Sequence, residues 1–135
     1  MAATCLLDSS VIIDAINDRN GRNELLDGVI AEGTLLACCS INITEVHMGM
    51  RPHEAERTEE FLGSLEFYPV TPEVARYAGE LYREWRHQGL TLALPDLTVA
   101  AVAIRNGLLL ATDNPKDFPM RELRLYSLPQ PGGAG

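Results

Sequence analysis

Acidic residues recur at four places where a folded chain could bring them together for metal chemistry. Asp8 ends the first apolar run, and Glu45 lies just past the second. Asp96 opens a late helical segment, and Asp113 follows the last strong apolar run. Open α/β sheets bind their ligands outside the carboxyl ends of the strands, so these side chains are expected to meet there. Crowded carboxylates repel one another and a hard divalent cation relieves that repulsion, so the spacing predicts a metal site.

The polar segment from Thr112 to Phe118 offers more than one candidate for the last acidic position. Asp113, Asn114 and Asp117 all lie in it, and spacing does not decide which of them faces the site. Asp, Asn and Pro are also the residues that ordinary turns favour, so turn formation alone explains their presence. The choice among the three therefore stays open.

Each of the other acidic residues also has a purely structural explanation when it is taken alone. Asp8 and Asp96 both precede or begin helical segments, where a carboxylate can cap the first turn. Glu45 borders the apolar stripe of its predicted helix, and a solvated glutamate would fit that position too. Three further acids are expected on solvated surfaces: Asp14, Asp18 and Asp27. The metal hypothesis therefore depends on the positions acting together.

The elements that must position these residues alternate between apolar runs and amphipathic segments. Strands are predicted over residues 3–8, 34–39, 66–70, 108–112 and 123–126, the last of them at an edge. Helices are predicted over residues 9–17, 22–32, 40–50, 53–64, 72–88 and 95–106. Thr71 can cap the clearest of these helices, and Pro72 suits its first turn. Apolar strands separated by helices predict an α/β fold with a parallel sheet covered on both faces.

Composition indicates one globular domain over residues 1–127 and a flexible Pro/Gly-rich tail over residues 128–135. The 135 residues are 46% hydrophobic and 22% charged, with a formal net charge of −8 that argues against a broad basic surface for nucleic acid.

No apolar stretch approaches the roughly 20 residues of a membrane helix, and the N-terminus lacks the basic start of a signal peptide. Three cysteines in apolar runs are expected in the core. A cytoplasmic protein is expected.

Four segments taken in order resemble a known family. They are Leu-Leu-Asp-Ser-Ser-Val-Ile-Ile-Asp over residues 6–14, Ser-Ile-Asn-Ile-Thr-Glu-Val over 40–46, Leu-Pro-Asp-Leu-Thr-Val-Ala-Ala over 94–101 and Ala-Thr-Asp-Asn-Pro-Lys-Asp-Phe over 111–118. Each segment is weak alone, but their order and spacing together resemble a PIN-domain ribonuclease of the VapC toxin type. The resemblance extends over about residues 3–127.

This resemblance implies a three-layer α/β/α sandwich with a central parallel sheet and a Mg²⁺ or Mn²⁺ site. It also implies cleavage of RNA, inhibition by a cognate VapB-type antitoxin and a homodimer. By motif, the residues that carry catalysis are Asp8, Glu45, Asp96 and Asn114, with Asp8 and Asp96 holding the metal ion. Supporting roles fall on Ser9, Thr112, Asp113 and Asp117. Asp113 stands where the family often has Arg, so the fourth acidic role stays open between Asp113, Asn114 and Asp117.

Two other classes of function are weighed against the ribonuclease. A non-catalytic PIN-like binding module would fit an Asn at the fourth position, but the acids at the first three positions are intact. A phosphoacceptor domain of the receiver type would need an adjacent acidic pair after the first strand, where Ser9 and Ser10 follow Asp8. A haloacid-dehalogenase-like phosphatase would need an aspartate in place of Ser10. The sequence therefore favours a metal-dependent endoribonuclease.

Overall fold

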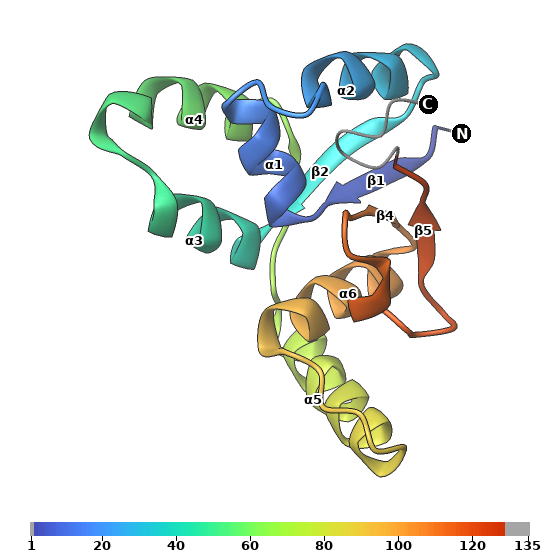
Figure 1. Cartoon of the computed structure of the whole chain (residues 1–135). Helices are drawn as coiled ribbons and strands as arrows, with labels where there is room; N and C mark the ends of the chain where they lie inside the picture. The colour runs from blue at the N-terminus through green and yellow to red at the C-terminus, as the bar shows by residue number, and fades with distance from the viewer. Residues whose placement is uncertain (1, 129–135) are drawn as a thin grey trace.

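Five short strands form one parallel sheet in the computed structural model, which describes residues 2–128 (Figure 1). The strands are β1 (Thr4–Leu7), β2 (Leu35–Cys39), β3 (Glu66–Tyr68), β4 (Leu109–Ala111) and β5 (Arg124–Tyr126). Their order across the sheet is β3-β2-β1-β4-β5, and every neighbouring pair is parallel. The last predicted strand is thus an edge strand, as expected. The first strand is central, so its carboxyl end lies in the middle of the sheet edge.

Helices connect the strands in the predicted order. They are α1 (Ser9–Ile16), α2 (Arg22–Ala31), α3 (Ser40–Gly49), α4 (Ala55–Gly63), α5 (Pro72–His87) and α6 (Leu94–Asn106), with short 3₁₀ turns η1 (Pro52–Glu54) and η2 (Pro115–Asp117). The helix predicted from residue 53 begins as the η1 turn, and its α-helical part starts at Ala55. The Thr71 hydroxyl oxygen accepts a hydrogen bond from the Val74 N–H at 3.1 Å and caps α5 as predicted.

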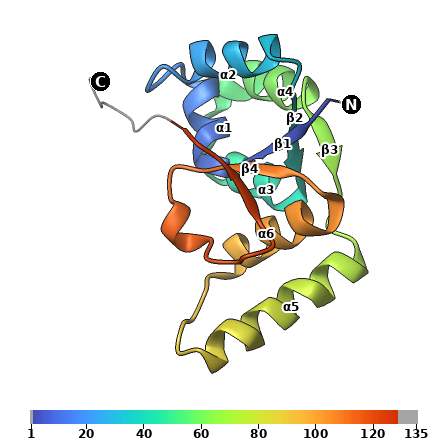
Figure 2. The ribbon, with the colours of Figure 1, turned by 90° about the vertical axis from the view of Figure 1, so that its right-hand side faces the viewer.

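The two faces of the sheet are covered by different helices (Figures 1 and 2). Side chains alternate along β1, so Leu6 packs with α5 and α6, while Cys5 and Leu7 pack with the layer of α1 to α4. Both layers bury their apolar stripes against the strands. This arrangement confirms the predicted α/β/α sandwich with a central parallel sheet.

Helix α6 carries Asp96 and is the most deeply buried helix of the described chain. Every residue from 97 to 103 is buried, and Ala100, Ala101 and Ala103 are fully enclosed. These small side chains let the helix lie close against the sheet and α5. Because α6 turns at Gly107 into the amino end of β4, its own first turn lies at the carboxyl edge of the sheet.

Outside this core, three further expectations can be compared with the structure. All three cysteines are free and buried, as predicted. No helix within residues 2–128 is both long enough and apolar enough to cross a membrane. The expected flexible tail lies outside the described residues except for Leu128, which packs half-buried against the core on the α1–α4 face.

Overpacking α6 is expected to destabilise the fold. Ala101→Leu would push a larger side chain into a site with no exposed surface, at a cost of about 1–3 kcal/mol in the free energy of unfolding. Urea denaturation followed by circular dichroism measures this cost. The matched control is Ala31→Leu at the end of α2, where the side chain is exposed and the change should be near zero. Equal effects of the two substitutions would contradict the tight packing of α6.

Candidate active site

The register of β1 and β4 places Asp8 and Thr112 side by side. Leu7 pairs with Ala111, and the Asp8 N–H donates to the Ala111 carbonyl oxygen at 2.9 Å. The Thr112 hydroxyl donates to Oδ2 of Asp8 at 2.7 Å, and the Ser9 N–H donates to Oδ1 at 2.9 Å. Asp8 is also the N-cap of α1, so capping and site formation are served by one carboxylate. Both of its oxygens are thereby oriented.

A second chain of hydrogen bonds holds Glu45 in the second turn of α3. The Ser9 hydroxyl donates to Oε1 of Glu45 at 2.7 Å and accepts from Nδ2 of Asn42 at 3.0 Å. Oδ1 of Asn42 accepts from the Cys39 N–H at 2.8 Å, and the Asn42 side chain is completely buried. Asn42 was not among the residues predicted to support the site. Its position three residues after the end of β2, which is the third helical position of a capping box, was the available signal.

Asp96 lies in the first turn of α6 but does not cap it, because the N-cap residue is Ala93. Burial raises the pKa of Asp96 to about 6, and the negative charges of Asp117, Asp8 and Glu45 add to the shift. Asp117, Asp8 and Glu45 are therefore within electrostatic reach of Asp96. Asp8, Glu45 and Asp96 therefore approach the same place from β1, α3 and α6.

The pKa of Asp8 is raised for the same two reasons, burial and neighbouring negative charges. Burial raises its pKa, the hydrogen bonds from Thr112 and the Ser9 N–H oppose that rise, and the charges of Glu45 and Asp113 reinforce it. Two half-buried aspartates, Asp8 and Asp96, therefore hold protons more strongly than free aspartate does. A bound cation would reverse that preference.

The three candidates in the turn after β4, which are Asp113, Asn114 and Asp117, have different surroundings in the structure. The Asn114 N–H donates to the Thr112 hydroxyl oxygen at 3.0 Å, while the residue itself is exposed. Asp117 lies exposed on η2, and its charge acts on Asp96 more strongly than those of Asp8 and Glu45. Asp113 pairs with Arg22 of α2, although its charge still acts on Asp8.

Arg22 is a residue that sequence reasoning missed. Its side chain is only 1% exposed and pairs with Asp113 through Nη2 and with Asp14 through Nε, the latter at 3.7 Å. The expectation of a solvated Asp14 is wrong, since its side chain is 16% exposed and faces the guanidinium. A buried cation requires such partners. An arginine after a polar turn shows no periodic pattern, so no signal in the sequence predicted its burial.

The donor set suits a hard cation although no complete cage exists. Within residues 2–128, no group of three or more His, Cys, Asp or Glu side chains is arranged to hold a metal ion. Mg²⁺ keeps several of its waters and commonly takes only one or two protein carboxylates. Asp8 and Asp96 offer oxygen ligands alone, which fits Mg²⁺ or Mn²⁺ better than a softer metal.

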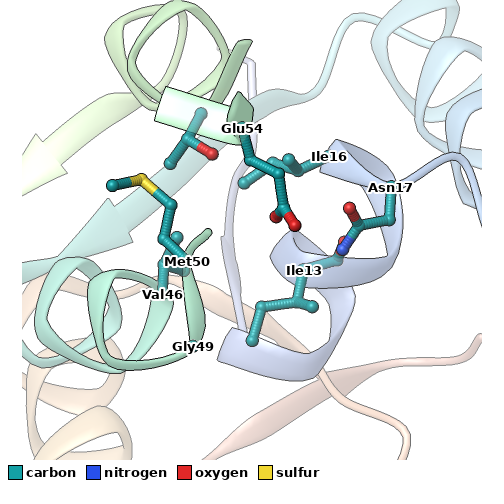
Figure 3. A pocket seen from close by; sticks show the side chains of 8 residues that line it. Ile13, Ile16, Asn17, Val46, Gly49, Met50 and Glu54 are labelled. Carbon is teal, nitrogen blue, oxygen red and sulfur yellow. The ribbon is translucent and has the colours of Figure 1, made fainter. Parts of the chain in front are cut away.

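A small cavity between α1, α3 and the start of α4 is separate from this site (Figure 3). Its volume is about 50 Å³. It is lined by Ile13, Ile16, Asn17, Val46, Gly49, Met50, Glu54 and Thr58. None of the residues predicted to carry catalysis is among them, so the cavity is not the acidic site.

Comparison with known proteins gives a consistent result. The PIN domain family model matches residues 5–120. Ribonuclease VapC10 of Mycobacterium tuberculosis is 32% identical over 117 residues, which cover 87% of this chain and 87% of that protein. Ribonuclease VapC19 of the same species is 29% identical over 115 residues, covering 85% of this chain and 92% of that protein.

Solved structures agree with the family match. The crystal structure of VapBC2 from Rickettsia felis bound to a promoter DNA fragment superposes with a TM-score of 0.82 at 26% identity, covering 93% of this chain and 99% of that one. The toxin–antitoxin complex from Klebsiella pneumoniae superposes with a TM-score of 0.74 at 26% identity, covering 92% and 99%. This chain therefore belongs to the PIN domain family, among the VapC toxins.

Proposed function

We propose that this protein is a metal-dependent endoribonuclease, the toxin of a VapBC-type pair, which hydrolyses RNA phosphodiesters with an activated water. The observation that carries the proposal is the convergence of Asp8, Glu45 and Asp96 at the carboxyl edge of the sheet. Burial and mutual repulsion raise the pKa values of Asp8 and Asp96 there. Such perturbed carboxylates are typical of functional sites.

Asp8 and Asp96 are the residues that would hold Mg²⁺ or Mn²⁺, and Asp117 is the additional acid beside Asp96. A bound ion of this kind lowers the pKa of a water and polarises a phosphate oxygen. Asp8 is suited to this role because Thr112 and the Ser9 N–H orient its two oxygens. Asn114 would act differently, since its exposed amide can donate a hydrogen bond to a phosphate oxygen of the RNA.

Glu45 is the group that would take the proton of the attacking water. The Ser9 hydroxyl holds it through Oε1, and Asn42 holds that hydroxyl in turn. A positioned carboxylate of this kind acts as a general base or as an anchor for the water. The buried amide of Asn42 thus supports the position of Glu45 from behind.

The alternative route, attack by the ribose 2′-hydroxyl, needs a pair of proton-transferring side chains such as two histidines. His47 pairs with Glu59, and His53 lies near Glu54, both on exposed helical segments. His87 is at the end of α5. The three histidines are thus on separate elements, and hydrolysis by water is the route that the residues support. Its products carry a 5′-phosphate and a 3′-hydroxyl.

Glu45→Gln is expected to lower kcat by about 10²–10⁴-fold, because it keeps the shape of the side chain and removes the base. Mn²⁺ binding and RNA binding should largely survive. Single-turnover cleavage of labelled structured RNA, with product ends mapped, measures the effect. Glu60→Gln on α4 is the matched control, since Glu60 is exposed and should be dispensable.

Three outcomes would contradict the proposed chemistry. Cleavage that persists in EDTA would exclude the metal, and products ending in a 2′,3′-cyclic phosphate would exclude attack by water. Wild-type protein that binds RNA but cleaves none in total cellular RNA, with either Mg²⁺ or Mn²⁺ present, would favour the non-catalytic binding module.

The raised pKa of Asp96 makes the stability of the metal-free protein depend on pH. Its pKa of about 6 exceeds the ordinary value of 3.8, so the folded protein binds more protons than the unfolded chain between these values. The stabilisation is fully present below pH 3.8 and is lost as the pH rises through 6. A carboxamide at position 96 carries no charge and escapes this loss.

Asp96→Asn is therefore expected to raise the melting temperature at pH 7 in EDTA and to flatten its decline between about pH 4 and pH 6. Differential scanning fluorimetry across this pH range measures both effects. Added Mn²⁺ should raise the melting temperature of wild type more than that of the variant, because binding to the folded state stabilises it. Asp27→Asn, at an exposed position, should match wild type. A lower melting temperature for Asp96→Asn in EDTA would contradict the charge conflict.

The proposed function includes two protein partners, an antitoxin and a second copy of the chain. A VapB-type antitoxin would cover the acidic site with a segment that brings an Arg or Lys, because that charge complements the carboxylates. A second copy of the chain would dock on the α5–α6 face, where Tyr82, Leu90 and Leu94 are exposed and a groove of about 470 Å³ runs between the two helices. Exposed apolar groups of this kind are typical of subunit contacts.

The protein alone is expected to run at twice its 14.8 kDa mass in size-exclusion chromatography with light scattering. Co-expression with the product of the neighbouring gene should give a larger complex that no longer cleaves RNA. A monomer that ignores this product would contradict both partners.

Leu94→Glu tests the dimer face directly, because it places a charge on a side chain that is 72% exposed in the single chain. The variant should run as a monomer. Phe67→Glu on β3, also an exposed apolar position, is the control and should remain dimeric. Identical masses for Leu94→Glu and wild type would exclude this face as the interface.

A further inference from the structure

The buried side chain of Arg22 has no part in the proposed reaction, although burying a guanidinium is costly. Its exposed fraction is 1%, and its two partner carboxylates, Asp14 and Asp113, are each 16% exposed. A buried cation is tolerated when paired charges and hydrogen bonds compensate the loss of water. Asp113 forms a hydrogen-bonded ion pair with the guanidinium, whereas Asp14 lies 3.7 Å from Nε, too far for a hydrogen bond, so the loss of Asp113 should disturb the local structure more.

The three charged residues connect segments that are distant in the chain. Asp14 belongs to α1, Arg22 begins α2, and Asp113 lies in the turn after β4, 91 positions beyond Arg22. The hydrogen bonds from Asn114 N–H to Thr112 and from Asp117 N–H to the Asn114 carbonyl are local to this turn. The ion pair between Arg22 and Asp113 joins the turn to α2, in addition to the hydrogen bond from Thr112 to Asp8 at the start of α1.

The anchored turn leads directly to the acidic site. Asp113 is bonded covalently to Thr112 and Asn114, and the Asn114 N–H donates to the Thr112 hydroxyl oxygen at 3.0 Å. The same hydroxyl donates to Oδ2 of Asp8 at 2.7 Å. A displacement of Asp113 would therefore shift the group that orients Asp8.

We propose that Arg22 is a positioning residue for the acidic site. By holding Asp113, it fixes the turn so that the Thr112 hydroxyl faces Asp8. The inference rests on the proposed function, because it takes Asp8 to be a metal ligand. Among the described residues, Asp14 contacts Nε of the same guanidinium but does not contact the turn.

This asymmetry gives a matched set of variants. Asp113→Ala and Arg22→Met both release the turn, whereas Asp14→Ala removes a carboxylate from the same buried arginine and leaves the Asp113 contact in place. Loss of a group that orients a metal ligand typically costs 10–100-fold in metal affinity. Asp113→Ala and Arg22→Met should therefore weaken Mn²⁺ binding by about that factor. Asp14→Ala should lower the melting temperature but keep Mn²⁺ affinity within about twofold.

Calorimetric titration with Mn²⁺ measures the affinity, and ¹⁵N relaxation of the metal-free protein measures the turn itself. Amide order parameters of Asp113 and Asn114 should fall from about 0.85, typical of rigid backbone, to below about 0.6 in Asp113→Ala and Arg22→Met. They should stay unchanged in Asp14→Ala. Equal losses of Mn²⁺ affinity in all three variants would show general destabilisation and overturn the proposal, as would unchanged affinity and order in Asp113→Ala.

A charge exchange keeps the test decisive if Arg22→Met fails to fold. Asp113→Arg alone places two guanidinium groups together and should weaken Mn²⁺ binding by at least tenfold, the lower end of that range. Adding Arg22→Glu restores an opposite-charge pair and should recover most of the affinity. Absence of recovery in a folded double variant would count against the ion pair.

Failure of the proposed function would look different. A wild-type protein that binds no Mn²⁺ would overturn the metal site itself. In that case ordered Asp113 and Asn114 amides in wild type, loosened in Asp113→Ala but not in Asp14→Ala, would still support the role of Arg22 in holding the turn.

Discussion

Mutual repulsion among carboxylates at one edge of the sheet is the constraint on which the site depends. The negative charges of Asp117, Asp8 and Glu45 act on Asp96, that of Glu45 also acts on Asp8, and burial strengthens the effect by removing water from both aspartates. Such an arrangement is unfavourable for the metal-free fold at neutral pH. It persists because the surrounding structure fixes the backbone of each acidic residue. The protein is thereby less stable than it could be, in exchange for a functional site.

Strands and helices fix the backbone positions of these acidic residues. Asp8 follows the central strand β1 directly and its N–H bonds to the Ala111 carbonyl of β4. Asp96 lies in the first turn of α6. The small buried residues of α6 let this helix pack tightly between the sheet and α5. Helices α1, α3 and α6 all begin at this edge, and their first turns carry partial positive charge that moderates the repulsion.

Hydrogen bonds orient the carboxylates once the backbone has placed them. One chain runs from the Cys39 N–H through Asn42 and Ser9 to Glu45, and another runs from the Asn114 N–H through Thr112 to Asp8. In each chain the hydroxyl both accepts and donates, so its direction is determined. Buried polar networks with every member paired are rigid, and this prepares the site before any ligand arrives.

The sequence alone determined the order of strands and helices and the meeting of Asp8, Glu45 and Asp96. Apolar periodicity is a local property, and the carboxyl ends of parallel strands share one edge, so both inferences needed no distant contact. The tertiary structure decided the rest: Asn42 behind Ser9, and Arg22 between Asp14 and Asp113. These pairings join residues up to 91 positions apart, and the packing of side chains, not any local pattern, selects them. For the same reason, only the folded chain distinguishes Asp117, whose charge acts on Asp96, from Asp113, which pairs with Arg22.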